Sequence, residues 1–152
     1  FRRIRDYYDL IIRYANVFFA GDVKDVSMTH VDGDNLEYVF ENLEYSTYGQ
    51  PGKVWLVVRE SPRYKTVSFI NLTGNDDLWN NGKEKPLPVE NITVRIQLDG
   101  KVKSVFYASP DEQMGRAREL EYSIEEGAHG NTAVVVVPKV DIWSLLVLEQ
   151  DI

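Results

Sequence analysis

Two apolar runs near the end of the chain decide the fold class. Residues 134–148 read VVVVPKVDIWSLLVL, in which Val134–Val137 is apolar at every position and Ile142–Leu148 nearly so. Short runs rich in β-branched residues are typical of strands. Runs that are apolar on both faces are typical of central strands with a covering layer on each side. We therefore expect two central strands here, in a β structure of more than one layer.

Further strands are predicted by apolar and polar alternation upstream. Residues 54–58 and 67–70 flank a turn-like stretch at 60–63 and are expected to form a hairpin. Leu120, Tyr122 and Ile124 alternate with mostly acidic residues, a pattern typical of an outer strand with an acidic solvent face. Seven or more short strands without a second helical pattern predict a mainly β fold. We expect an antiparallel β-sandwich with Greek-key topology, or a Greek-key barrel, preceded by one N-terminal α-helix.

The register of one further hairpin can be argued from its turn. Asp99-Gly100 signals a reversal between the alternating residues 92–96 and the run 102–106. A two-residue loop would place Ile96 opposite Lys103 on the buried face. A three-residue loop over 98–100 pairs Ile96 with Val102 and keeps that face apolar. We therefore expect a hairpin with a type I turn and Gly100 in the bulge position.

Residues 1–19 are the segment with a clear helical period. At about 100° per residue the polar side chains gather in one arc, with three opposite-charge pairs four residues apart. The apolar side chains spread over roughly 220°, about twice the stripe that a surface helix needs. The helix is therefore either sunk in this domain's own core or clamped between this domain and a partner. For the second interpretation we expect the interface residues Ile4, Tyr7, Ile11, Tyr14 and Phe18.

Charge divides the chain near Gly21. Residues 1–19 contain four arginines and two aspartates, a net +2, so the other 133 residues must carry −9 to give the total of −7. We expect a helical segment over 1–20 and an antiparallel β domain over 21–152. The acidic balance argues against a nucleic-acid partner, because phosphate binding relies on clustered basic residues.

Length and composition limit the class of protein further. The 152 residues suffice for one domain with a real core. No apolar run approaches the roughly 18 residues needed to cross a bilayer, so no membrane span is expected. The absence of cysteine excludes disulfides, thiolate nucleophiles and zinc–thiolate sites. Because the chain begins with Phe1 and not with Met, we expect it to be part of a longer polypeptide.

Catalytic and ligand-binding signals are sparse. His30 and His129 lack the spacing of zinc ligands and are expected in solvated loops. The acidic stretches 32–35 and 75–77 do not follow a calcium-loop pattern and are expected to be turns. Trp79 is a candidate sugar contact, although a Trp tucked beneath its own loop is the commoner arrangement. No catalytic, cofactor-binding or metal-binding residue is assigned.

Several short motifs, in their order along the chain, carry a family resemblance. They are Ile4–Leu10 with Tyr14–Asn16, Gly52–Trp55, Ile70–Asp76 with Trp79, Ala108–Asp111, Val137–Pro138 and Ile142–Trp143. Over nearly the whole chain this sequence resembles the C-terminal region of family 66 glycoside hydrolases. These are the dextranases and the cycloisomaltooligosaccharide glucanotransferases.

The resemblance implies a function for the parent polypeptide. Members of that family use a (β/α)8 barrel, with an Asp nucleophile and a Glu acid/base, to attack α-1,6-glucan with retention. Neither catalytic residue can be placed on this chain, so no active site is expected in it. Residues 1–20 would resemble the barrel's last helix, and the β domain would pack on the barrel and stabilise it. An extracellular or cell-surface location is implied by the polymeric substrate.

Two other functions remain open. One is a free-standing carbohydrate-binding or adhesive β-sandwich module. The other is an accessory domain of a different barrel glycosidase, such as an α-amylase relative. The broad apolar face of the first helix favours an accessory domain, because a self-sufficient binding module has no need of it.

Overall fold

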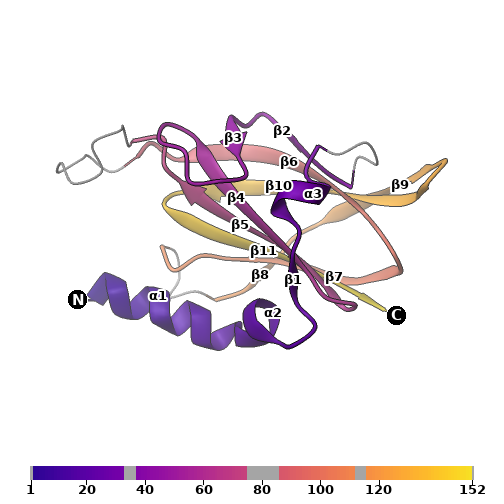
Figure 1. The fold of residues 1–152 in the computed structure, drawn as a ribbon, viewed down its shortest axis with the longest axis horizontal. Helices are drawn as coiled ribbons and strands as arrows, with labels where there is room; N and C mark the ends of the chain where they lie inside the picture. The colour runs from indigo at the N-terminus through magenta and orange to yellow at the C-terminus, as the bar shows by residue number, and fades with distance from the viewer. Residues whose placement is uncertain (1, 33–36, 75–85, 112–115, 152) are drawn as a thin grey trace.

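The computed structural model describes residues 2–32, 37–74, 86–111 and 116–151. Two β-sheets face each other, and a helical layer lies below one of them (Figure 1). The larger sheet has seven strands: β1 (Lys24–Asp25), β4 (Val54–Glu60), β5 (Tyr64–Asn71), β11 (Trp143–Asp151), β7 (Lys101–Ala108) and β8 (Arg118–Glu119) in this order, with β3 (Tyr45–Ser46) beside β4. The smaller sheet has four: β2 (Tyr38–Glu41), β6 (Val89–Gln97), β10 (Gly130–Val140) and β9 (Tyr122–Gly127).

The expected mainly β, sandwich-like fold is confirmed. Every pair of neighbouring strands in the two sheets is antiparallel except β3 with β4. The main core lies between the sheets, where alternate residues of each strand point inward. Its fully buried members include Tyr38, Leu56, Phe69, Ile92, Ile96, Val137, Leu146 and Leu148. Greek-key connectivity as such stays a prediction.

The hairpin expected from residues 54–70 is present. β4 and β5 pair along their length, with Val58 opposite Val67 and Glu60 opposite Lys65. Val54, Leu56 and Val58 enter the main core. The intervening side chains therefore point to the other face of the seven-stranded sheet, where the helices lie.

The second expected hairpin is wrong. β6 pairs with β2 and β10, whereas β7 pairs with β11 and β8, so the chain crosses between the sheets at residues 98–100. The side chain of Gln150 accepts the backbone N–H groups of Asp99 and Gly100, at 3.2 Å each. Leu98 donates its N–H to the carbonyl of Asn131 at 2.9 Å. The backbone N–H groups of residues 98–100 therefore bond to partners that are remote in sequence, and not within the local turn that was expected.

The two apolar runs near the C-terminus differ in their surroundings. β11 is covered on both faces as expected, because Leu146 and Leu148 face the main core and Leu145 and Val147 face the helices. β10 is central in its sheet, but Val136 is 49% exposed on the outer face. The expectation of a covering layer on both sides is therefore wrong for β10. The helical layer lies below the seven-stranded sheet only (Figure 1).

β9 is an edge strand, as its acidic alternation predicted. Its apolar side chains Tyr122 and Ile124 are exposed as well. The hairpin of β9 and β10 projects beyond the rest of the sandwich (Figure 1). Tyr122 and Ile124 line an open hollow together with Lys101 and Val102 of β7.

The N-terminal helix is present but in two parts. α1 (Arg2–Arg13) and α2 (Ala15–Phe19) are separated at Tyr14, whose backbone angles leave the helical region. The N–H of Tyr14 still bonds the carbonyl of Leu10 at 3.1 Å, so the two parts continue one another. A further short helix, α3 (Ser27–His30), follows β1. None of the helices in the described ranges has the length and apolar character needed to span a membrane.

Candidate functional site: the exposed face of the N-terminal helices

One side of the N-terminal helices packs on the domain's own sheet. Leu10, Tyr14, Val17 and Phe18 are buried and form a second cluster with Ala108 of β7 and Leu145 and Val147 of β11. This contact covers the β11 and β7 half of the outer sheet face. It fixes which side of the helices remains available to solvent.

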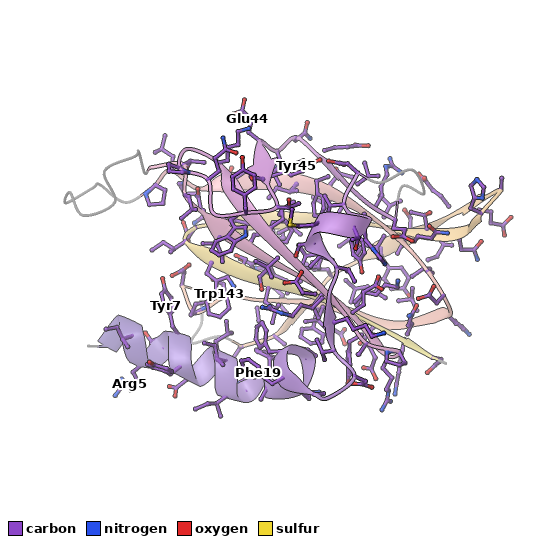
Figure 2. All side chains as sticks on the ribbon, in the orientation of Figure 1. Arg5, Tyr7, Phe19, Glu44, Tyr45 and Trp143 are labelled. Carbon is purple, nitrogen blue, oxygen red and sulfur yellow. The ribbon has the colours of Figure 1, made fainter. Side chains whose placement is uncertain are left out.

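The start of β11 holds α1 in place through Asp111 and Trp143. Asp111 Oδ2 accepts the backbone N–H groups of Ile142 at 3.0 Å and Trp143 at 2.9 Å, and Tyr7 donates its hydroxyl to Asp111 Oδ1 at 3.3 Å. The rings of Tyr7 and Trp143 meet edge to face at 5.9 Å. Figure 2 shows Tyr7 pointing from α1 toward Trp143, and Arg5 pointing away from the sheet. These contacts set the rotation of α1 about its axis.

A stripe of apolar side chains remains exposed along the other side of the helices. Ile4 is 57% exposed, Tyr8 61%, Ile12 72% and Phe19 70%. The first three stand four residues apart, so they align on one helix face. We call Ile4, Tyr8, Ile12 and Phe19 the helix stripe. Large side chains aligned in this way favour a contact with another surface, because soluble monomers rarely leave a contiguous apolar patch uncovered.

An apolar groove lies beside the helix stripe. Its volume is about 610 Å³, and it occupies the β4 and β5 half of the outer sheet face, which the helices leave open. Its floor consists of Trp55, Val57, Ser68, Ile70 and Trp143. Ile11, Phe18 and Phe19 form the helical wall, so the groove and the helix stripe share Phe19. Together they form one continuous apolar surface.

The five predicted interface residues are divided between the two sides of the helices. Tyr14 and Phe18 are buried in the domain's own second cluster, and Tyr7 and Ile11 are half-buried. Ile4 is exposed in the helix stripe. The exposed side also carries Tyr8, Ile12 and Phe19, which the prediction did not name. The four-residue spacing of Ile4, Tyr8 and Ile12 could have indicated them, but the sequence does not show which half of the apolar face meets the sheet.

The two histidines lie in different surroundings. His129 is exposed in the turn between β9 and β10. The expectation of a solvated loop is wrong for His30, which ends α3 and is half-buried, with Nδ1 3.3 Å from Glu37 Oε2. Within the described residues, no group of three or more potential metal ligands occurs. Trp79 and the stretch 75–77 lie outside these residues, as do 33–35 of the other acidic stretch.

A group of charged side chains forms a structural network at one end of the sandwich. Lys65 is buried, and its Nζ lies 2.9 Å from Glu60 Oε1 and 3.1 Å from Asp99 Oδ2. Tyr38, on the opposite sheet, donates its hydroxyl to Glu60 Oε1 at 2.7 Å. Burial, and then the nearby negative charge of Glu60, raise the pKa of Tyr38 well above its usual range. Because Tyr38 and Glu60 belong to different sheets, this network joins the two sheets.

The family of the chain is decided by a match along almost its whole length. The sequence profile of glycosyl hydrolase family 66 matches residues 1–147. The chain belongs to this family. The family resemblance of the short motifs is therefore confirmed.

Relatives in the family are much longer than this chain. Two cycloisomaltooligosaccharide glucanotransferases from Niallia circulans are 25% identical over 149 residues and 27% identical over 151 residues. Each match covers 97% of this chain and 15% of the relative. The chain thus corresponds to a small part of these family 66 proteins.

Solved structures share the fold. A crystal structure of a Paenibacillus sp. cycloisomaltooligosaccharide glucanotransferase, complexed with cycloisomaltoheptaose, matches with a TM-score of 0.79 and 28% identity. The match covers 96% of this chain and 20% of that chain. Alpha-L-fucosidase isoenzyme 2 from Paenibacillus thiaminolyticus matches with a TM-score of 0.54 and 17% identity, over 79% of this chain and 16% of that chain. The second likeness shows a similar fold only.

Residues from several of the family motifs meet around the turn that joins β10 to β11. In the motif Ala108–Asp111, Ser109 donates its hydroxyl to the carbonyl of Trp143 at 2.6 Å, beside the Asp111 contacts described above. Asn71, from another motif, donates its side-chain amide to the carbonyls of Leu87 and Asp141 at 2.9 Å each. The motifs therefore fix this end of the sandwich and, through Asp111, the position of α1.

Proposed function

We propose that this chain is the non-catalytic C-terminal β domain of a dextran-degrading family 66 glycoside hydrolase or transglycosylase. In this proposal the helix stripe docks on the catalytic (β/α)8 barrel of the same polypeptide and stabilises it. The observation that carries the proposal is the exposure of Ile4, Tyr8, Ile12 and Phe19 on helices whose opposite side is buried in this domain.

The energetics of apolar burial support docking. Covering apolar surface contributes about 25 cal/mol for each Å² removed from water. The four side chains of the helix stripe and the adjoining groove provide apolar surface that docking would remove from water. The chain spans 15% of the length of its Niallia circulans relatives, so most of a polypeptide of that length would be available to provide the covering surface.

The proposal gives residues 1–20 two contacts. Tyr14 and Phe18 hold the helices to the β domain. The helix stripe faces the barrel, and residues 1–20 would form the last helix of that barrel. A helix that packs on both domains in this way fixes their relative placement. The width of its apolar face is then accounted for, because each half serves a different neighbour.

The chemistry of the parent enzyme lies outside this chain in our proposal. The family resemblance assigns cleavage or transfer of α-1,6-glucan to an aspartate and a glutamate of the barrel, and neither has a counterpart among these 152 residues. The domain contributes stability and not catalysis. The polymeric substrate favours an extracellular or cell-surface location for the enzyme.

A truncation tests the stabilising role. The full polypeptide is compared with one that ends before Gly21, and both melting temperatures are measured. We expect the truncated form to melt several degrees lower or to aggregate, because the side of the helices that carries Tyr14 and Phe18 loses the β domain that covers it. Equal melting temperatures would refute the stabilising role. Binding of isomaltooligosaccharide by residues 1–152 alone, together with equal melting temperatures, would favour a free-standing carbohydrate-binding module instead.

A further inference from the structure

The groove beside the helix stripe carries a cation at its edge. Arg59 of β4 lines the groove, and its guanidinium lies over the ring of Phe18, 5.8 Å from the ring centroid. It is half-buried and has no carboxylate partner among the residues that the structure describes. A guanidinium has five N–H donors in a fixed plane and favours a carboxylate that can accept two of them.

Asp25 is the cross-strand neighbour of Arg59 within the domain. Asp25 of β1 lies directly opposite Arg59 in the strand ladder and also lines the groove. However, its Oδ1 accepts the N–H of Ser27 at 2.9 Å and the hydroxyl of Ser27 at 2.7 Å. Asp25 therefore stabilises the start of α3 through Oδ1, and it does not lie within ion-pair distance of Arg59 among the described residues.

The side of the groove opposite the helical wall is formed by α3. Met28 of α3 also lines the groove and is 78% exposed. The groove thus offers an apolar floor, two apolar walls and one cationic donor. This combination fits a chain segment that presents an apolar side chain next to a carboxylate.

The geometry points to one occupant of the groove. We propose that it receives an apolar side chain from the catalytic part of the same polypeptide, next to an Asp or Glu that pairs with Arg59. This inference rests on the proposed function, since the groove is continuous with the helix stripe through Phe19. The charge of the neighbouring wall agrees with an acidic partner. Residues 1–19, which form this wall, carry a net +2, while the remainder carries −9.

Photo-crosslinking in the full polypeptide tests the inference. Benzoylphenylalanine replaces Met28 in one variant, Ile12 in a second and Val136 in a third. Val136 is the control, because it is exposed on the outer face of the other sheet. We expect the probes at Met28 and Ile12 to link to the catalytic part, and the probe at Val136 to give no such link. The peptide linked to Met28 should contain an Asp or Glu close to the attachment point.

Arg59 is tested in the background of the Met28 probe. We expect Arg59→Glu to abolish most of the crosslinked product and Arg59→Gln to reduce its yield. The control is Arg63→Glu, an exposed charge reversal, which should leave the yield unchanged. Replacing the acidic residue of the linked peptide by Lys should restore the link in the Arg59→Glu variant. A role of Arg59 in packing alone would not produce this rescue.

The outcomes separate this inference from the proposed function. Links from Ile12 without links from Met28, or links from Met28 that Arg59→Glu leaves unchanged, would overturn the groove assignment and leave the docking of the helix stripe standing. The absence of links from both Ile12 and Met28 would overturn both.

Discussion

The carboxylate of Asp111 accepts the backbone N–H of Trp143 at 2.9 Å. This contact connects the segment that follows β7 to the beginning of β11. The same carboxylate accepts the N–H of Ile142 and the hydroxyl of Tyr7. Three donors from two distant parts of the chain therefore converge on one side chain. Because Tyr7 belongs to α1, Asp111 also determines how the N-terminal helices face the solvent.

Asp111→Ala should destabilise the domain by about 2–4 kcal/mol, because two backbone N–H groups lose a charged acceptor. Urea unfolding of the chain measures this. The matched control is Tyr7→Phe, which removes only the hydroxyl on the same carboxylate and should cost less than about 1 kcal/mol. Equal losses for the two variants would show that Asp111 does not hold the start of β11.

Ser27→Ala should destabilise the edge of β4. Ser27 is buried, and its hydroxyl oxygen accepts the N–H of Val58 at 2.8 Å while its proton goes to Asp25. Removing the hydroxyl leaves the Val58 N–H buried without its acceptor, at a cost of about 1–3 kcal/mol. Hydrogen exchange at Val58 should accelerate. The exposed neighbour Thr29→Ala should change the free energy of unfolding by less than about 0.5 kcal/mol; a comparable loss there would contradict this account.

Tyr38 should make the fold sensitive to alkaline pH. Burial and the charge of Glu60 raise its pKa above the usual value of 10.0, so the folded state keeps the proton that the unfolded state loses. Its contribution to stability is therefore complete below about pH 10 and decreases as the pH rises further. The free energy of unfolding should fall more steeply between about pH 9 and pH 11 in the wild type than in Tyr38→Phe. Parallel pH profiles would contradict the assignment.

Local sequence patterns predicted the elements whose partners are also local. The β4 and β5 hairpin follows from two β-branched runs and the turn between them, and β9 follows from its acidic alternation. The expected pairing of 92–96 with 102–106 failed because the corner depends on Gln150, about 50 positions away in sequence. A turn signal such as Asp99-Gly100 indicates a reversal but does not specify the sheet that receives the next strand.

The candidate site was only half predictable for a similar reason. The width of the apolar face of residues 1–19 indicated that one sheet could not cover it. The half that meets the sheet depends on Asp111 and Trp143, which hold Tyr7 from more than 100 positions away. The groove and Arg59 could not be predicted at all, because they require knowing which half of the sheet face the helices leave open.

Cysteine labelling of the full polypeptide tests the central claim most directly. The 152 residues contain no cysteine, so Ile12→Cys places a single thiol in the helix stripe and Val136→Cys places one on the exposed face of the other sheet. Any cysteines elsewhere in the polypeptide are replaced first. If the helix stripe is covered by the catalytic part, the thiol at position 12 reacts far more slowly than the thiol at position 136 under native conditions, and equally fast in urea. Equal native rates at the two positions would contradict the account.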